Sequence, residues 1–134
     1  MITAKIYYEK GLKTLAQHTK SLARIETDAP LDNQGKGQAF SPTDLLATSL
    51  GSCMLTLIGI VSERNNINIS GLYSEVEKEM AKNPRRISRI NIKIIFNKYL
   101  SASDRKKIEL AASSCPVAKS LSSNLKINIK FIYE

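Results

Sequence analysis

Residues 41–64 read SPTDLLATSLGSCMLTLIGIVSER, and this stretch decides the fold. Its first residues carry helix-start signals, because Ser41 can cap a helix, Pro42 suits the first helical position and Asp44 favours the positive end of the helix dipole. Residues 45–61 include no charged side chain. We therefore expect a long helix that is buried on nearly all sides, around which the rest of the chain must wrap.

The same stretch falls short of a membrane span. A spanning helix needs about 20 apolar residues, whereas the uncharged run is shorter and contains small and polar residues, namely Thr48, Ser49, Gly51, Ser52, Thr56 and Gly59. The remaining segments alternate apolar and polar residues, as strands of a soluble domain do. We expect no membrane partner, and the small residues indicate that another helix or strand packs closely against this one.

Composition and charge are those of an ordinary globular domain. The chain has 134 residues, of which 43% are hydrophobic and 24% charged, so a single domain spanning 1–134 is expected. The formal net charge of +8 would permit nucleic-acid binding. However, the basic residues are scattered and aromatic residues make up only 6%, which argues against a nucleic-acid partner.

Cysteine usage indicates the compartment and argues against a metal site. The N-terminus reads as a strand and not as a secretory signal, so two cysteines suggest reduced thiols and a cytoplasmic protein. One His and two Cys are too few and too dispersed for a zinc site, and we expect neither metal nor cofactor. Gly35-Lys36-Gly37 lacks P-loop spacing, so the loop 28–40 is interpreted as a lid or entrance over the helix start.

Periodicity along the chain predicts an α+β fold with the order β-β-β-α-β-β-α-α-β. Helix signals recur at Ser101, which has capping-box spacing to Asp104, and at Pro116, which can begin a short helix to about Ser122. Alternation predicts a three-stranded antiparallel meander over 1–9, 12–19 and 22–27. It then predicts a hairpin with one solvent-exposed face over 67–80 and 86–96, and a last strand over 125–131.

The two cysteines occupy different settings. Cys115 precedes Pro116 and so lies at a helix N-cap, where unpaired N–H groups and the helix dipole favour the thiolate. Cys53 lies in the middle of the apolar helix, where burial raises the pKa of a thiol unless a cation lies nearby. The residues alone leave two interpretations open, a reactive pair or two small core residues.

Taken together, these motifs resemble one family. Ser41-Pro42-x-x-Leu45-Leu46-Ala47, followed by Cys53 on the same helix and by Cys115-Pro116, is similar to the OsmC/Ohr family of osmotically inducible and organic hydroperoxide resistance proteins. The resemblance covers nearly the whole chain, including the order of elements. The loop that follows Thr27 resembles an OsmC-like branch of the family.

This resemblance implies an intertwined homodimer with its long helices back to back and thiol peroxidase chemistry. Cys53 would attack an organic hydroperoxide and become a sulfenic acid, Cys115 would condense with it to a disulfide, and a dithiol reductant, either a small molecule or a lipoyl-type protein, would restore both thiols. The alternative is a non-catalytic OsmC-like dimer that binds a small apolar or redox ligand in the same pocket.

The chain departs from the family pattern at the cation that supports the attacking thiolate. The family uses an Arg–Glu pair, whereas here the Glu position is Thr43, the acid is Asp44 and the Arg position falls near Lys20. Lysine supplies a point charge but cannot copy a bidentate guanidinium. Arg85 and Arg86 are substitute candidates. We therefore expect a higher thiol pKa and slower peroxide turnover than in the family.

Overall fold

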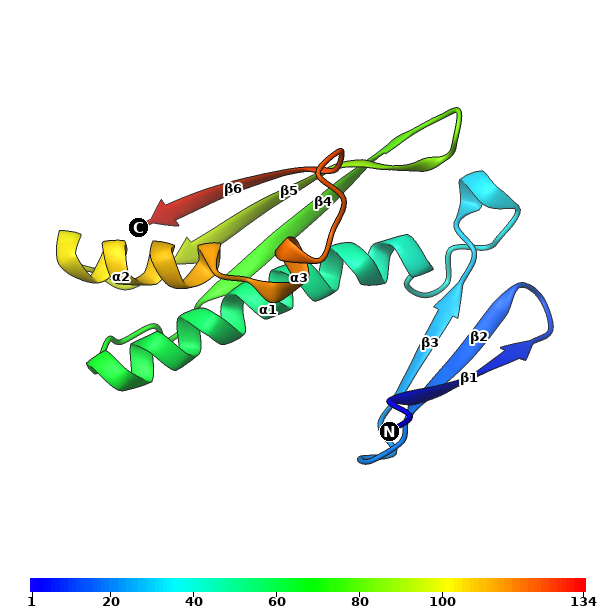
Figure 1. The fold of residues 1–134 in the computed structure, drawn as a ribbon, viewed down its shortest axis with the longest axis horizontal. Helices are drawn as coiled ribbons and strands as arrows, with labels where there is room; N and C mark the ends of the chain where they lie inside the picture. Colours follow the sequence, from blue (N-terminus) through cyan, green and yellow to red (C-terminus); the bar gives the residue numbers. More distant parts are fainter. The chain divides into compact units, whose positions relative to one another are not determined.

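The computed structural model describes residues 1–134, which form two compact units, 1–46 and 47–134. The elements follow the predicted order β-β-β-α-β-β-α-α-β, with one additional 3₁₀ turn (Figure 1). Their bounds are β1 Ala4–Glu9, β2 Lys13–His18, β3 Arg24–Asp28, η1 Leu31–Asn33, α1 Pro42–Asn65, β4 Tyr73–Ala81, β5 Arg86–Phe96, α2 Ala102–Ser113, α3 Pro116–Lys119 and β6 Lys126–Tyr133.

The unit 1–46 is built on an antiparallel meander, β1-β2-β3, which confirms the three strands predicted at the start of the chain. Beyond β3 the chain makes the 3₁₀ turn η1 and then returns to the sheet. The Asp28 N–H donates to the Phe40 carbonyl at 3.0 Å, and Thr27 forms an isolated bridge with Phe40. The base of the loop is thereby closed, and α1 begins immediately after it.

Ser41 caps the start of α1, as the sequence predicted, and Asp44 bonds back to it. The Ser41 N–H donates to Asp44 Oδ2 at 2.9 Å, and the Asp44 N–H donates to Ser41 Oγ at 3.0 Å. This is capping-box geometry with Asp in the place of the usual Glu. Ser41 is buried, so these bonds satisfy groups that water does not reach.

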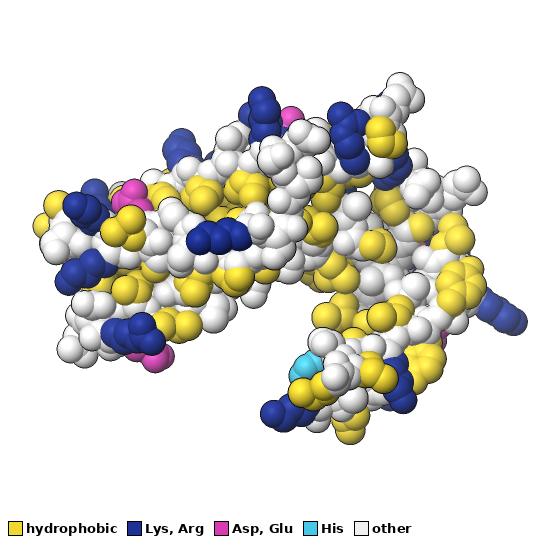
Figure 2. Space-filling view, viewed as in Figure 1, with side chains coloured by type: hydrophobic (Ala, Val, Ile, Leu, Met, Phe, Trp, Pro, Cys, Tyr) yellow, Lys and Arg dark blue, Asp and Glu magenta, His cyan; other side chains and the backbone are white.

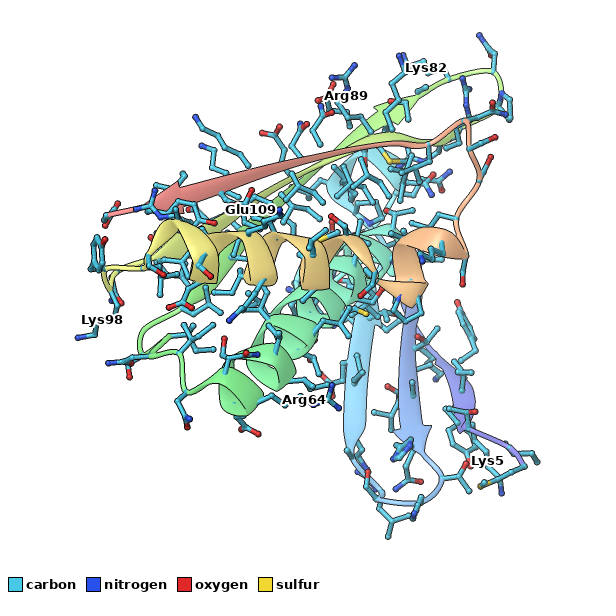
Figure 3. All side chains as sticks on the ribbon, turned by 60° about the vertical axis from the view of Figure 1, so that its left-hand side comes forward. Lys5, Arg64, Lys82, Arg89, Lys98 and Glu109 are labelled. Atoms are coloured by element: carbon cyan, nitrogen blue, oxygen red, sulfur yellow. The ribbon has the colours of Figure 1, made fainter.

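In the unit 47–134 a three-stranded sheet carries the helices on one face (Figure 1). β4 and β5 are antiparallel, whereas β5 and β6 are parallel. The side chains that β5 directs to the helices are buried, namely Ile90, Ile92, Ile94 and Phe96, as the alternation predicted. The labelled Arg89 and Lys82 lie on the side of the sheet away from the helices (Figure 3).

Within one chain α1 is buried along a single stripe, so a single chain does not supply the burial on nearly all sides that the sequence predicts. The buried residues are Ala47, Leu50, Gly51, Met54, Ile58 and Ser62, and their spacing follows the helical period. Ile60, by contrast, is 43% exposed. The reason is geometric, because one small sheet with two short helices covers only part of the circumference of a helix.

Gly51 brings α1 close to the sheet. A Cβ atom at this position would lie 2.8 Å from Cγ1 of Val76 on β4, which is closer than side-chain carbons approach. This contact accounts for one of the small residues in the apolar run. By length and composition α1 could cross a membrane, but a core helix of a soluble protein has the same features, and the contact with Val76 is that of a core helix.

Two predicted boundaries were wrong. The segment 67–72 is not a strand, because the Leu72 N–H bonds to the Ile69 carbonyl in a turn and Gly71 has a φ of 80°.

The short helix α3 ends at Lys119 and not near Ser122, because the last amide hydrogen bonds are made by Ser120 and Leu121. Serines beyond that point favour a turn.

Helix α2 is fixed to the end of β6 by polar and aromatic contacts. Ser101 caps the helix by accepting from the Asp104 N–H, as predicted. The Tyr133 hydroxyl donates to Glu109 Oε2 at 2.7 Å, and the Tyr133 ring stacks on Phe96 with centroids 4.9 Å apart. The Arg105 guanidinium lies 4.1 Å from the centroid of the same ring. This anchoring sets the direction in which the chain leaves α2 toward Cys115.

Candidate thiol site

Cys115 lies at the N-cap of α3, where the sequence placed it. Its Sγ accepts a hydrogen bond from the Ala118 N–H at 3.4 Å, and Pro116 occupies the first helical position. The side chain is fully buried. Sulfur is a weak acceptor, so this hydrogen bond holds the thiol in one orientation and leaves it able to react.

Cys53 lies halfway along α1 and is partly exposed. The Cys115 side chain and the Val117 backbone N–H both lie close enough to act on the Cys53 thiol. Both cysteines are free thiols. The helices α1 and α3, which are distant in the sequence, thus bring the two sulfur atoms together.

The environment raises the pKa of the Cys53 thiol. Burial is the largest cause, because it disfavours the charged thiolate, and the hydrogen bond with Cys115 adds to the effect. The Val117 N–H acts in the opposite direction, since it stabilises the thiolate. The groups that act on Cys53 therefore include a main-chain dipole and a second thiol.

The other predicted site residues have definite places of their own. Asp44 is engaged by Ser41 in the cap of α1. Arg86 lies at the tip of the β4–β5 hairpin and donates to the carbonyls of Lys82 and Pro84, at 3.0 and 2.9 Å. Lys20 is exposed in the turn between β2 and β3. The structure thus groups the two cysteines, whereas these three residues belong to separate local structures.

Two further features of the sequence have local structural roles. His18 is exposed, and its Nδ1 lies 2.6 Å from Ser21 Oγ. In the Gly35-Lys36-Gly37 segment, a Cβ on Gly35 would overlap the Ala29 carbonyl, and Gly37 has a φ of 60°. Glycine is therefore required here by loop closure, which explains the motif without a phosphate.

Val117 was not among the site residues predicted from the sequence. The group that reaches Cys53 is a main-chain N–H, which every residue except proline carries. The only available signal is indirect. Pro116 removes the N–H of the first helical position, so the Val117 amide is the first in α3 that can donate.

Comparison with known proteins places this geometry in a family. The OsmC-like protein family matches residues 35–130. The chain belongs to the OsmC/Ohr family. A crystal structure from Psychrobacter arcticus 273-4, assigned as an osmotic stress induced and detoxification response protein, is 51% identical, with a TM-score of 0.92 over 100% of this chain and 96% of that chain. No curated protein matches the chain.

More distant members of the OsmC/Ohr family share the fold. An organic hydroperoxide resistance protein OsmC from Legionella pneumophila has a TM-score of 0.76 at 16% identity, over 98% of both chains. An OsmC-like protein from Mycoplasma pneumoniae has a TM-score of 0.82 at 20% identity, over 97% of this chain and 94% of that chain. The α+β fold and the family resemblance predicted from the sequence are thereby confirmed.

Proposed function

We propose that this OsmC/Ohr protein is a thiol peroxidase that reduces organic hydroperoxides through Cys53 and Cys115. The observation that carries the proposal is the proximity of the two thiols, close enough for Cys115 to act on the pKa of Cys53. Membership of a family that includes organic hydroperoxide resistance proteins supports a peroxide-related redox role. Two thiols in contact, one of them on the surface side of a core helix, suit a reaction that ends in a disulfide.

The reaction balances with one hydroperoxide and one dithiol. The Cys53 thiolate attacks the outer oxygen of the O–O bond, that bond breaks, and the alkoxide takes a proton and leaves as an alcohol. Cys53 is now a sulfenic acid. The Cys115 sulfur attacks the Cys53 sulfur and water leaves, which forms the disulfide. A dithiol reductant then returns both cysteines to thiols by two exchange steps and is itself oxidised to a disulfide.

The contacts around the sulfur atoms suit these steps. A disulfide has an S–S length of about 2.05 Å, so the two neighbouring thiols must move together to form one. Helix α3 has four residues, whereas α1 has 24. The movement therefore falls on α3, which carries Cys115.

A cation must still assist the reaction, because O–O cleavage places negative charge on the leaving oxygen. We propose Lys20 as the first candidate, since it occupies the family's Arg position. Arg86 is the second candidate, although its guanidinium already donates to two carbonyls of its own hairpin. Asp44 would orient the cation, but it shares its carboxylate with the helix cap.

The working form that we propose is a cytoplasmic homodimer. Apolar side chains lie on the surface of both units (Figure 2). They include Ile60, Tyr73 and Leu110 in one unit, and Ile2, Ile6, Tyr8 and Ile25 in the other. Exposed apolar areas of this kind are typical of interfaces. A second copy would also cover the part of α1 that a single chain leaves exposed.

A second candidate function is a non-catalytic dimer that binds a small apolar or redox ligand. The raised pKa of Cys53 favours this alternative. A thiol that stays protonated is a poor nucleophile. The two candidates differ in whether peroxide is consumed.

Stopped-flow assays of tert-butyl hydroperoxide consumption, with dihydrolipoamide as the dithiol, distinguish the two candidates. A peroxidase consumes one hydroperoxide per dithiol oxidised and works through many turnovers. Consumption no faster than that of free cysteine at the same concentration would contradict the peroxidase and leave the ligand-binding dimer. The Cys53→Ser variant, which removes the attacking sulfur with little change in size, provides the matched control.

A further inference from the structure

A cavity of about 240 Å³ lies within the unit 1–46, between β1, β2 and the end of β3. Its wall includes three acidic residues, Glu9, Glu26 and Asp28, together with Lys13 and Gln38. None of these residues belongs to the proposed thiol chemistry. Ligand binding in this cavity can therefore be tested independently of the peroxidase proposal.

The strand register places the four charged residues on one face of the meander. Lys13 on β2 lies directly opposite Glu9 on β1 and directly opposite Asp28 on β3. Residues directly opposite each other in a sheet share a face. Glu26 precedes Asp28 by two positions and so shares that face as well. The charged residues that line the cavity, three carboxylates and one ammonium, have a formal charge of −2. Lys5 and Arg24 lie farther along the same face, outside the cavity lining.

Asp28 is the residue that indicates a bound ligand in this cavity. Its side chain is 1% exposed, and Oδ2 accepts from the Gln38 N–H at 3.0 Å. Oδ1 is also buried and has no hydrogen-bond partner. Leaving such an oxygen without a donor costs free energy, so buried carboxylate oxygens are normally satisfied. Lys13 does not fill this role, because its ammonium is directed to Gln38 Oε1 at 2.9 Å.

We propose that this cavity binds a small organic ammonium ion, with Asp28 as the anchoring carboxylate. An ammonium group supplies N–H donors, one of which would satisfy the unpartnered Asp28 Oδ1, and a positive charge that would offset the excess of carboxylates over ammonium groups in the cavity wall. The acidic side chains are not gathered closely enough to hold a metal ion, which favours an ammonium over a metal. Because the charged residues that line the cavity sum to −2, a diammonium with its second group toward Glu9 or Glu26 should bind more tightly than a monoammonium.

Isothermal titration calorimetry on the full chain with 1,4-diaminobutane at low salt tests this proposal. We expect saturable binding of one diamine per chain, weaker binding of butylamine and none of 1,4-butanediol, which has the same length without charge. Asp28→Asn should weaken diamine binding by about tenfold or more, since it removes a charge-assisted hydrogen bond. Glu63→Gln removes the same charge from an exposed position on α1 and is the matched control, with no expected change.

Glu26→Gln keeps the test valid if Asp28→Asn fails to fold, because Glu26 is exposed and its replacement should not alter the melting temperature. It should weaken binding of the diamine more than binding of butylamine. Absence of saturable heat with the wild-type chain would overturn the proposal and leave the cavity to water. Equal affinity for the diamine and the diol, or an unchanged affinity in Asp28→Asn, would overturn it as well.

Discussion

The thiols of Cys53 and Cys115 lie close enough to act on each other, one from the middle of a 24-residue helix and the other from the cap of a four-residue helix. In the same short helix the Ala118 N–H donates to Cys115 Sγ, and the Val117 N–H acts on the Cys53 thiol. The long helix α1 and the short helix α3 thus hold the two sulfur atoms. This arrangement makes an intramolecular disulfide accessible without unfolding the core helix.

The two cysteines should have unequal roles in peroxide reduction. Cys53 is partly exposed, whereas Cys115 is fully buried, so Cys53 is the sulfur that a peroxide can reach. Cys53→Ser should abolish peroxide consumption. Cys115→Ser should complete one turnover and leave a sulfenic acid on Cys53, which a dimedone adduct and mass spectrometry would detect. A dimedone adduct on Cys115 in the Cys53→Ser variant would reverse the assignment.

The peroxide reaction should accelerate as pH rises through the Cys53 pKa. Burial raises that pKa, so near neutral pH most of the thiol is protonated, and each added pH unit below the pKa raises the thiolate fraction about tenfold. Thr43→Glu combined with Lys20→Arg should lower the pKa and speed the reaction at pH 7. Thiolate absorbance against pH in a Cys115→Ser background measures the pKa. A wild-type value below about 6, within the range of activated thiols, would show that another cation already acts on Cys53.

Replacing Gly51 should separate α1 from the sheet. Its Cβ would lie 2.8 Å from Val76 Cγ1, and overpacking of a core costs about 1–3 kcal/mol. Alanine returns up to about 1 kcal/mol through its higher helix propensity, so Gly51→Ala should lower the free energy of unfolding by about 1 kcal/mol. Urea denaturation measures the change. Adding Val76→Ala makes room for the new methyl group, and a double-mutant cycle without coupling between the two changes would contradict the contact.

Assembly should depend on the exposed side of α1. Light scattering at micromolar concentration should give a mass twice that of the 14.9 kDa chain, since permanent interfaces bury about 2,000 Å² or more. Ile60→Glu places a charge on the exposed side of the helix and should shift the protein toward monomer. Lys98→Glu makes a larger charge change at a position beyond the end of β5, labelled in Figure 3, and serves as the control. A folded wild-type monomer would contradict the dimer.

The sequence predicted the fold well where local rules decide it. The Ser41–Asp44 cap, the Ser101 cap and the alternation of Ile90, Ile92 and Ile94 depend on neighbouring residues or on the period of a strand, and the structure confirms all three. The segment 67–72 was misjudged, because its apolar residues alternate as in a strand while Gly71 adopts a positive φ that turns the chain.

The candidate site was harder to predict than the fold, because its contacts join distant parts of the chain. Position in sequence indicated that Cys115 caps a helix, but it did not give the proximity to Cys53, which depends on how α3 packs against α1. The Val117 amide has no side-chain signature. Asp44 was a candidate for orienting a cation, and it proved to share its carboxylate with a helix cap, since local hydrogen bonds compete for short acidic side chains.

The central claim is that Cys53 and Cys115 form a disulfide when the protein meets a hydroperoxide. One equivalent of tert-butyl hydroperoxide is added to the reduced wild-type chain, the remaining thiols are alkylated, and the unreduced digest is analysed by mass spectrometry. We predict one peptide pair joined through a disulfide between Cys53 and Cys115, formed at the same rate as the peroxide is lost and cleaved by dihydrolipoamide. Both cysteines alkylated as free thiols while the peroxide remains intact would contradict it.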